Sequence, residues 1–164
     1  HPGAVLGAEG FGLAMDAGQW IKVPQLGGVV VGDDCEIGAN TCIDRGAIED
    51  TVLEQDVRLD NLVQVGHNAR IGAHTAMAGC VAVAGSARIG RWCLVGGGAG
   101  IAGHLTICDK VTITAMSLVT ASITEPGEYS SAMTVQESRR WRRNAARFRQ
   151  LDGLARRMGA PNKD

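Results

Sequence analysis

An aliphatic residue or Met recurs at every sixth position between Leu53 and Val119. Written in sixes from Thr51, the chain reads TVLEQD, VRLDNL, VQVGHN, ARIGAH and so on, and the third place of every hexad is Leu, Val, Ile or Met. A period of six matches neither an α-helix nor an amphipathic strand. A fixed repeat length is instead typical of a solenoid.

The same spacing begins upstream at Val31, Ile37 and Ile43, and a four-residue offset within 44–50 resets it. We expect each hexad to form one short strand with its aliphatic residue inside, while a small residue beside it lets the corner turn. Three hexads then close one triangular coil of about 18 residues, and coils stack about 4.8 Å apart. The in-register positions predict about five coils, or roughly 24 Å of prism. A β-sandwich or a right-handed β-helix would not require an unbroken period of six.

Two segments interrupt the repeat. Residues 7–28 are rich in Gly and contain Trp20 and Pro24, which predicts a loop or hairpin that projects from one corner. The sequence Glu125-Pro126-Gly127 predicts the end of the solenoid. We therefore expect a solenoid domain over 1–126 and a basic helical extension over 127–164.

The extension has the pattern of an amphipathic helix. Thr134 and Glu137 have the spacing of a capping box, and Gly159 and Pro161 supply a stop signal. Gly153 inside it costs about 1 kcal/mol relative to Ala and argues against an unbroken rod. The predicted apolar stripe recurs at spacings of three and four and consists of Trp141, Ala145, Phe148, Leu151, Leu154 and Met158.

Charge separates the two parts of the chain. Residues 1–133 hold seven Lys and Arg against fourteen Asp and Glu, whereas residues 134–158 hold eight Arg against two acidic residues. The basic helix is either a solvated face or a docking site for an acidic partner. Nucleic acid is a weaker candidate because the prism is acidic. If the helix docks a partner, Arg142, Arg143 and Arg147 are the candidate contacts.

The chain shows no apolar run long enough to cross a membrane and no secretory signal. Its missing initiator Met suggests a truncated or processed chain. The five cysteines are odd in number and form no CxxC pair, which argues against a disulfide framework or a zinc knuckle. We expect them to be inert thiols in a reducing cytoplasm.

His67 and His104 are the candidate catalytic residues. They lie 37 residues apart, two coils plus one residue, which places both on one edge about 10 Å apart along the axis. Imidazole titrates near neutral pH and suits a general base. From spacing alone, two solvated surface histidines remain an equal alternative.

His74 is expected to be structural, because it lacks comparable polar neighbours in the sequence. A zinc site would need His74 as a third ligand and bridging between subunits, since histidines two coils apart on one chain can hardly share an ion.

Several motifs together identify a family resemblance. Beyond the hexads, these are GFG at 10–12, WIKVPQ at 20–25, IDRGAIEDT at 43–51, DN at 60–61, QVGHN at 64–68, AGS at 84–86, GH at 103–104 and YSS at 129–131. Over nearly the whole chain they resemble the UDP-3-O-(3-hydroxyacyl)glucosamine N-acyltransferases of lipid A and lipopolysaccharide biosynthesis, which are hexapeptide-repeat acyltransferases.

The resemblance implies a left-handed parallel β-helix, although most crossovers are right-handed, and a cytoplasmic homotrimer with its active sites between neighbouring prisms. A 3-hydroxyacyl group would arrive on the phosphopantetheine arm of acyl carrier protein, with no tightly bound cofactor and no metal. It would pass to the 2-amine of a UDP-amino-sugar. The family's N-terminal uridine-binding domain would precede this chain and is absent from it.

By motif match, His67 is the general base, the backbone N–H of Gly85 is the oxyanion donor, and His104 is the second active-site histidine. Asp60, Asn61 and Gln64 are expected to line the same cleft, and Leu118 to form a wall. Rival interpretations are the O-acyltransferase of the same pathway, a CoA-dependent acetyltransferase, or a β-helix that serves only as a scaffold.

Overall fold

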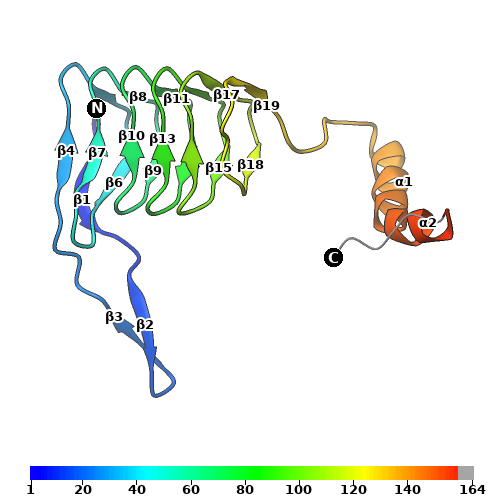
Figure 1. The fold of residues 1–164 in the computed structure, drawn as a ribbon, viewed down its shortest axis with the longest axis horizontal. Helices are drawn as coiled ribbons and strands as arrows, with labels where there is room; N and C mark the ends of the chain where they lie inside the picture. Colours follow the sequence, from blue (N-terminus) through cyan, green and yellow to red (C-terminus); the bar gives the residue numbers. More distant parts are fainter. Residues whose placement is uncertain (159–164) are drawn as a thin grey trace. The chain divides into compact units, whose positions relative to one another are not determined.

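The structure is a computed structural model and describes residues 1–158. Its larger unit, residues 1–132, is a parallel β-solenoid whose strands form three sheets, drawn as stacked coils in Figure 1. The strand order in the sheets is β1-β6-β9-β12-β15-β18, β4-β7-β10-β13-β16 and β5-β8-β11-β14-β17-β19. The strands are β1 (Val5–Glu9), β4 (Val29–Val31), β5 (Glu36–Ile37), β6 (Cys42–Arg45), β7 (Thr51–Leu53), β8 (Arg58–Leu59), β9 (Gln64–Val65), β10 (Arg70–Ile71), β11 (Ala76–Met77), β12 (Ala82–Val83), β13 (Arg88–Ile89), β14 (Leu94–Val95), β15 (Gly100–Ile101), β16 (Thr106–Ile107), β17 (Val111–Ile113), β18 (Leu118–Val119) and β19 (Gly127–Tyr129).

Strand pairing follows the predicted coil length. Ile71 pairs with Leu53 below it and with Ile89 above it, so each coil is three hexads long. Two coils are longer. Cys42 pairs with Gln64 because the offset within 44–50 forms an enlarged corner, and Val5 pairs with Cys42 because the insertion lies between them. The predicted period of six residues, with one offset within 44–50, is confirmed.

Each hexad contributes two residues to the core, which stack into rows along the prism. The predicted third-place residues from Ile43 onward are buried, as at Ile71 and Ile89, whereas Val31 at the start of the solenoid is 37% exposed. The first-place residues, two positions earlier, are buried as well, including Val57, Val81 and Thr75. Because strand side chains alternate, the second-place residue faces outward. Small aliphatic residues therefore fill the prism without large aromatics.

Corners turn at the sixth place of the hexad, where the backbone has a φ near +60°. Most of these residues are not glycine: Asp56, Leu62, Asn68, His74, Cys80, Ser86, Trp92, His104, Lys110 and Met116. The expectation that the small fourth-place residue makes the turn is wrong. An added Cβ at Gly72 would lie 2.5 Å from the carbonyl carbon of Gly90 in the next coil, so that glycine allows close stacking of coils.

The predicted insertion is a projecting hairpin. Strands β2 (Leu13–Asp16) and β3 (Gln19–Lys22) pair antiparallel around Ala17 and Gly18, both at positive φ as a two-residue I′ turn requires. Figure 1 shows the hairpin extending away from the coils. The insertion starts later than position 7, because β1 pairs with β6 as a strand of the solenoid.

The solenoid also ends later than predicted. Strand β19 pairs with β17, so residues 127–129 belong to the coils and the second unit begins at Met133. That unit contains α1 (Ser138–Arg149) and α2 (Leu151–Arg157), which meet at Gln150. The helix thus breaks at Gln150, before the suspected Gly153. Gly159 and Pro161 lie outside the described residues.

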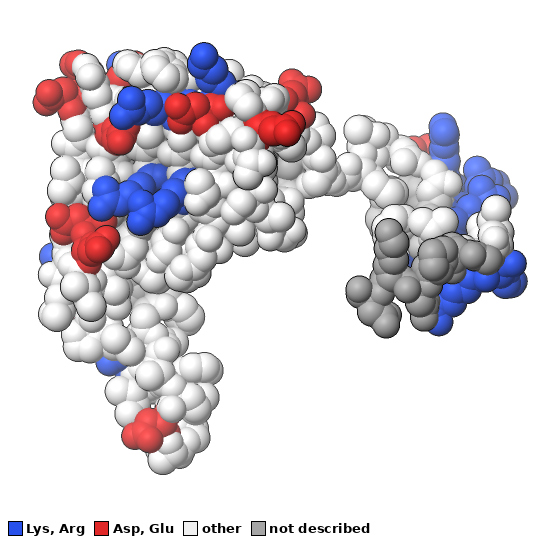
Figure 2. Space-filling model, in the orientation of Figure 1, with Lys and Arg blue, Asp and Glu red and all other residues white. Residues whose placement is uncertain are grey.

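The predicted capping box does not form. The helix begins at Ser138, so Glu137 is the N-cap, and its carboxylate accepts hydrogen bonds from the backbone N–H groups of Arg139 and Arg140 at 2.9 Å. These bonds lower the pKa of Glu137. In Figure 2, Lys and Arg gather over the helical unit, while Asp and Glu spread over the solenoid. Within the described residues, neither helix has the length and apolar character that a membrane crossing requires.

Candidate functional site

A cleft of about 650 Å³ runs along the outer face of the sheet β1-β6-β9-β12-β15-β18. It has a polar end and an apolar end. Asp44, Gln64 and His67 lie at the first coils, and small side chains form the floor beneath them down to Leu118. The lining residues are Phe11, Asp44, Gln64, Gly66, His67, Ala82, Val83, Ala84, Gly85, Gly100, Ile101, Ala102 and Leu118.

The stacking of the coils explains why the cleft is polar at one end and apolar at the other. Asp44, Gly66, Ala84 and Ala102 each follow the inward residue of their strand, so one carboxylate stands above three small residues. Because coils are about 4.8 Å apart, the cleft is an elongated groove along the prism axis. Such a groove suits a substrate with a polar head and an apolar tail.

His67 is half-buried at the corner after β9, and its orientation is fixed by Asn68. The Asn68 Oδ1 atom lies 2.9 Å from His67 Nδ1 and accepts a hydrogen bond from the N–H of Ala47 at 3.0 Å. The Asn68 amide nitrogen donates to the carbonyl oxygen of Glu49 at 2.8 Å, which sets the direction of the amide. His67 Nδ1 must therefore donate to Asn68, and Nε2 keeps a free lone pair that can accept a proton.

Gly85 lies one coil from His67 on the same corner, directly against the imidazole. An added Cβ at Gly85 would lie only 2.6 Å from His67 Nε2, so a larger residue would displace the ring. Among the described residues, the N–H of Gly85 makes no hydrogen bond, whereas its carbonyl oxygen accepts from the N–H of His104 at 3.1 Å. The structure thus brings together the predicted base and a backbone donor.

His104 occupies the same edge, one coil beyond Gly85 and two coils beyond His67. It follows β15, which stacks on β12 and, beyond that, on β9, so the predicted same-edge placement is confirmed. His104 is exposed, has a φ of 61° and does not line the cleft of His67. Its predicted role in the reaction stays a prediction.

Asp44 and Asn68 were not recognised from the sequence as site residues. Asp44 is half-buried, and its Oδ2 atom accepts a hydrogen bond from Gln64 Nε2 at 3.0 Å. Burial raises the pKa of Asp44, and the Gln64 hydrogen bond partly opposes this. Asp44 precedes the enlarged corner, so the coil that leads to His67 is longer than three hexads. The three-hexad spacing therefore does not predict that Asp44 stacks on Gly66. Asn68 had a signal, since it follows His67 directly in the QVGHN motif.

Phe11 borders the same cleft from the loop between β1 and β2. Its ring is 86% exposed. The preceding residue, Gly10, is buried, and an added Cβ there would lie 2.8 Å from His67 Cβ. The N–H of Gly12 donates to the carbonyl oxygen of Gly10 at 2.9 Å, so a tight three-residue turn presents Phe11 beside the polar end.

Within the chain, Asp60 and Asn61 lie at a different corner from His67, so their predicted place in a cleft between neighbouring prisms stays a prediction. They precede β9 and His67 follows it, so a whole prism face separates them within the chain. Asp60 Oδ1 accepts from the Asn61 N–H at 2.7 Å, and Asn61 Oδ1 accepts from the N–H of Ala39 at 2.7 Å.

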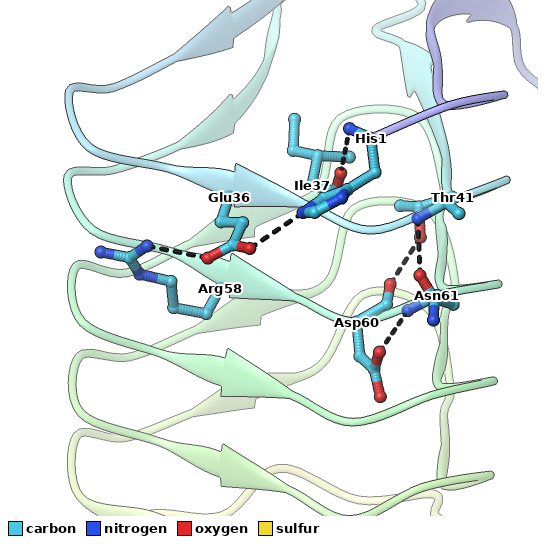
Figure 3. A network of polar contacts seen from close by, with 8 residues as sticks. His1, Glu36, Ile37, Thr41, Arg58, Asp60 and Asn61 are labelled. Atoms are coloured by element: carbon cyan, nitrogen blue, oxygen red, sulfur yellow. Dashed lines mark hydrogen bonds and ion pairs between the residues drawn. The ribbon is translucent and has the colours of Figure 1, made fainter.

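Figure 3 shows Asp60 and Asn61 among polar contacts on the neighbouring face, where Glu36 lies between His1 and Arg58. Both residues line a second groove of about 710 Å³ on this face. Only Gln64 of the three predicted binding residues shares the cleft of His67.

His74 is located at the third corner of the prism, away from the cleft. Its Nδ1 atom lies 3.0 Å from Asp56 Oδ2, and its ring stacks on Trp92 with centroids 5.4 Å apart. The hydrogen bond from His74, aided by Arg58, lowers the pKa of Asp56. The expectation that His74 lacks polar neighbours is wrong. No cluster of three or more His, Cys, Asp or Glu side chains able to hold a metal occurs within residues 1–158.

The three predicted docking residues lie on α1. Arg142, Arg143 and Arg147 are exposed. Arg142 donates to Ser138 Oγ at 3.3 Å, and Arg147 borders a groove together with Phe148 and Leu151. No residue of α1 or α2 is buried.

Comparisons with known proteins agree with the predicted fold. LpxA from Acinetobacter baumannii matches 79% of this chain and 49% of its own with a TM-score of 0.70 and 21% identity. The UDP-N-acetylglucosamine acyltransferase of Francisella novicida matches 71% of this chain and 41% of its own, with a TM-score of 0.63 and 19% identity. These matches concern the fold alone, and they confirm the left-handed parallel β-helix.

Sequence relatives are much closer. The UDP-3-O-acylglucosamine N-acyltransferase of Xanthomonas campestris is 76% identical over all 164 residues, which are 49% of its length. The protein of that name from Xylella fastidiosa is 71% identical and is covered over 48% of its length. No family model matches the chain. The chain spans about half the length of these relatives, and over that span it belongs to the UDP-3-O-acylglucosamine N-acyltransferase family.

Proposed function

We propose that the full-length protein is an N-acyltransferase of lipid A biosynthesis that acts in the cytoplasm. It moves a 3-hydroxyacyl group from acyl carrier protein to the 2-amine of UDP-3-O-(3-hydroxyacyl)glucosamine, the class of acceptor in its relatives' name. The observation that carries the proposal is the His67 imidazole, held by Asn68 at Nδ1 with Nε2 against Gly85 in the cleft. The donor's phosphopantetheine arm makes a tightly bound cofactor unnecessary.

The residues suit the chemistry of amide formation. The amine nitrogen attacks the thioester carbon while His67 Nε2 accepts a proton from that nitrogen. The N–H of Gly85 stabilises the negative charge that develops on the carbonyl oxygen. The tetrahedral intermediate then releases the thiol, and His67 returns its proton to the departing sulfur. The products are one amide and one free thiol. We assign to His104, which lies on the same edge, the role of positioning the donor.

Replacing His67 tests this proposal directly. In the full-length protein, His67→Ala should lower kcat at least about 100-fold, the usual contribution of general acid–base catalysis. His74→Ala is the matched control, because His74 lies at another corner and should leave kcat unchanged. An unchanged rate in His67→Ala would refute the base. Product analysis with amine and hydroxyl acceptors separates an N-acyltransferase from an O-acyltransferase, and total inactivity would favour a scaffold.

The proposed assembly is a homotrimer. Outward residues of the β4-β7-β10-β13-β16 sheet include Arg70 and Arg88, whereas the corner between the other two sheets exposes Leu62 and Met116. Exposed apolar ridges mark association surfaces. Leu62→Glu should dissociate the assembly in light scattering, and Arg88→Glu should not. A monomeric wild-type protein would contradict the proposal.

The proposed docking site for acyl carrier protein is the basic face of α1. Its support is the net positive charge of residues 134–158 against an acidic partner. Reversing the charges of Arg142, Arg143 and Arg147 should raise KM for acyl carrier protein, and added salt should weaken the wild-type interaction. Arg88→Glu serves as the control on the solenoid. If neither charge nor salt changes KM, the face is only solvated.

A further inference from the structure

The cleft contains one formally charged side chain beside His67, and the amide-forming step described above does not use it. Of the residues that line the cleft, Asp44 alone is Asp, Glu, Lys or Arg. Gln64 occupies its Oδ2 atom at 3.0 Å. Among the described residues, no donor reaches its Oδ1 atom. The carboxylate therefore has one oxygen fixed and one available to a ligand.

Asp44 also stands next to the reacting groups. It is directly above Gly66 in the stack, because Ile43 pairs with Val65. Gly66 has no side chain to fill the space below the carboxylate, and His67 is the next residue. Asp44 and His67 are close enough to interact electrostatically. A ligand atom placed against His67 Nε2 is thus within reach of Asp44, one coil or about 4.8 Å away.

The charge of Asp44 restricts what it can bind. A nucleotide sugar carries negative charge on its diphosphate, so a half-buried carboxylate repels most of the acceptor. The hydroxyls of an amino-sugar can donate to a carboxylate as well, but only the amine also acquires positive charge, so a carboxylate attracts it both through N–H···O hydrogen bonds and through that charge. Phe11, at the same end, offers an apolar surface rather than a competing charge.

We propose that Asp44 binds the acceptor's 2-amino nitrogen and makes the site select an amine over a hydroxyl. This rests on the proposed function and deepens it. As nitrogen attacks the thioester and passes its proton to His67, it carries developing positive charge, which the carboxylate stabilises. A hydroxyl gives its only proton to the base and gains much less from Asp44. Gln64 holds the carboxylate in place and is a positioning residue.

The test uses the full-length protein with UDP-3-O-(3-hydroxyacyl)glucosamine and the analogue bearing a hydroxyl at carbon 2. Asp44→Asn keeps the size of the side chain and its hydrogen bond with Gln64. It should lower kcat/KM for the amine acceptor about 10- to 100-fold, as expected on loss of a charge-assisted hydrogen bond. The KM for the acyl donor should not change, and the ratio of amine to hydroxyl acylation should fall. Asp33→Asn, an exposed carboxylate outside the cleft, is the matched control.

The possible outcomes separate the inference from the proposed function. If wild-type protein and Asp44→Asn prefer the amine equally, the inference fails while the proposed function stands. If Asp44→Asn slows both acceptors to the same extent, Asp44 is only structural and the inference also fails. If the wild-type protein acylates no amine, the proposed function fails first. The thermal midpoint of Asp44→Asn should stay near that of Asp33→Asn, which separates lost recognition from lost folding.

Discussion

The solenoid buries a core of apolar side chains, whereas the C-terminal helices expose theirs. In the coils, Ile71, Ile89 and Ile107 are at most 4% exposed, and every strand of the three sheets is paired with a coil above or below. In the helices, Phe148 is 69% exposed and no residue is buried. The solenoid is therefore stabilised by contacts within one chain. Within their own unit the helices leave their apolar stripe exposed, which is typical of a surface that associates with something else.

The largest effect is expected in the coils. Ile71→Ala should lower the free energy of unfolding by about 2–5 kcal/mol, because it removes a fully buried side chain from a stacked row. Urea denaturation measures this. Arg70→Ala, whose side chain faces solvent on the same strand, should change the value by less than about 0.5 kcal/mol. Equal effects at the two positions would mean that the coils are not packed as described.

A polar residue inside the prism should have the next largest effect. The buried Thr75 Oγ1 donates to the carbonyl oxygen of Gly90 at 2.8 Å and accepts from the N–H of Cys93 at 3.1 Å. Thr75→Val leaves both backbone groups without this partner and should cost about 1–3 kcal/mol. Thr106→Val, at an exposed position, is the control in the same denaturation assay. A neutral Thr75→Val would show that these bonds do not join the coils.

A smaller and local effect is expected at the start of the helices. The hydrogen bonds that lower the pKa of Glu137 make its folded pKa lower than its unfolded value, so its contribution to helix stability is present above about pH 4.3. That contribution is lost as the pH falls through the folded pKa. Circular dichroism should show helix loss in acid, and Glu137→Gln should already have reduced helix at neutral pH. The same pH dependence in Glu137→Gln would contradict this role.

The smallest effect on unfolding is expected at the exposed stripe. Phe148→Ala should change the free energy of unfolding of the isolated chain by less than about 0.5 kcal/mol. The Ile71→Ala variant shows how large the change in the free energy of unfolding is for a buried side chain. A loss as large as that expected for a buried side chain, about 2 kcal/mol or more, would show that the helices pack on something within the chain. The contrast between the two regions would then disappear.

The repeat made the fold predictable because period six reports directly on side-chain direction. Trp141, Phe148 and the other stripe residues predicted a helix, but the break at Gln150 and the cap at Glu137 depend on local backbone geometry that spacing does not encode. The first-place core residues, such as Val57 and Thr75, escaped notice because several of them are small or polar.

The candidate site was predictable in part. His67, Gln64 and Gly85 meet in one cleft because the three-hexad spacing stacks them on one face and its corner. The family resemblance put Asp60 in the cleft of His67, whereas within one chain a strand that spans a prism face separates the two residues. Asp44 was missed because the enlarged corner changes the coil length at that point. The family resemblance supplied the predicted chemistry. Spacing alone left open whether His67 and His104 are catalytic or solvated surface histidines.

In the mechanism proposed above, the cleft between Asp44 and Leu118 holds the reacting amine against His67. A crystal structure of the full-length protein with UDP-3-O-(3-hydroxyacyl)glucosamine tests it most directly. We expect the 2-amino nitrogen within about 3.2 Å of His67 Nε2, with its sugar at the Asp44 end. An amine bound in the groove of Asp60 on the same chain, with the His67 imidazole facing only solvent, would contradict it.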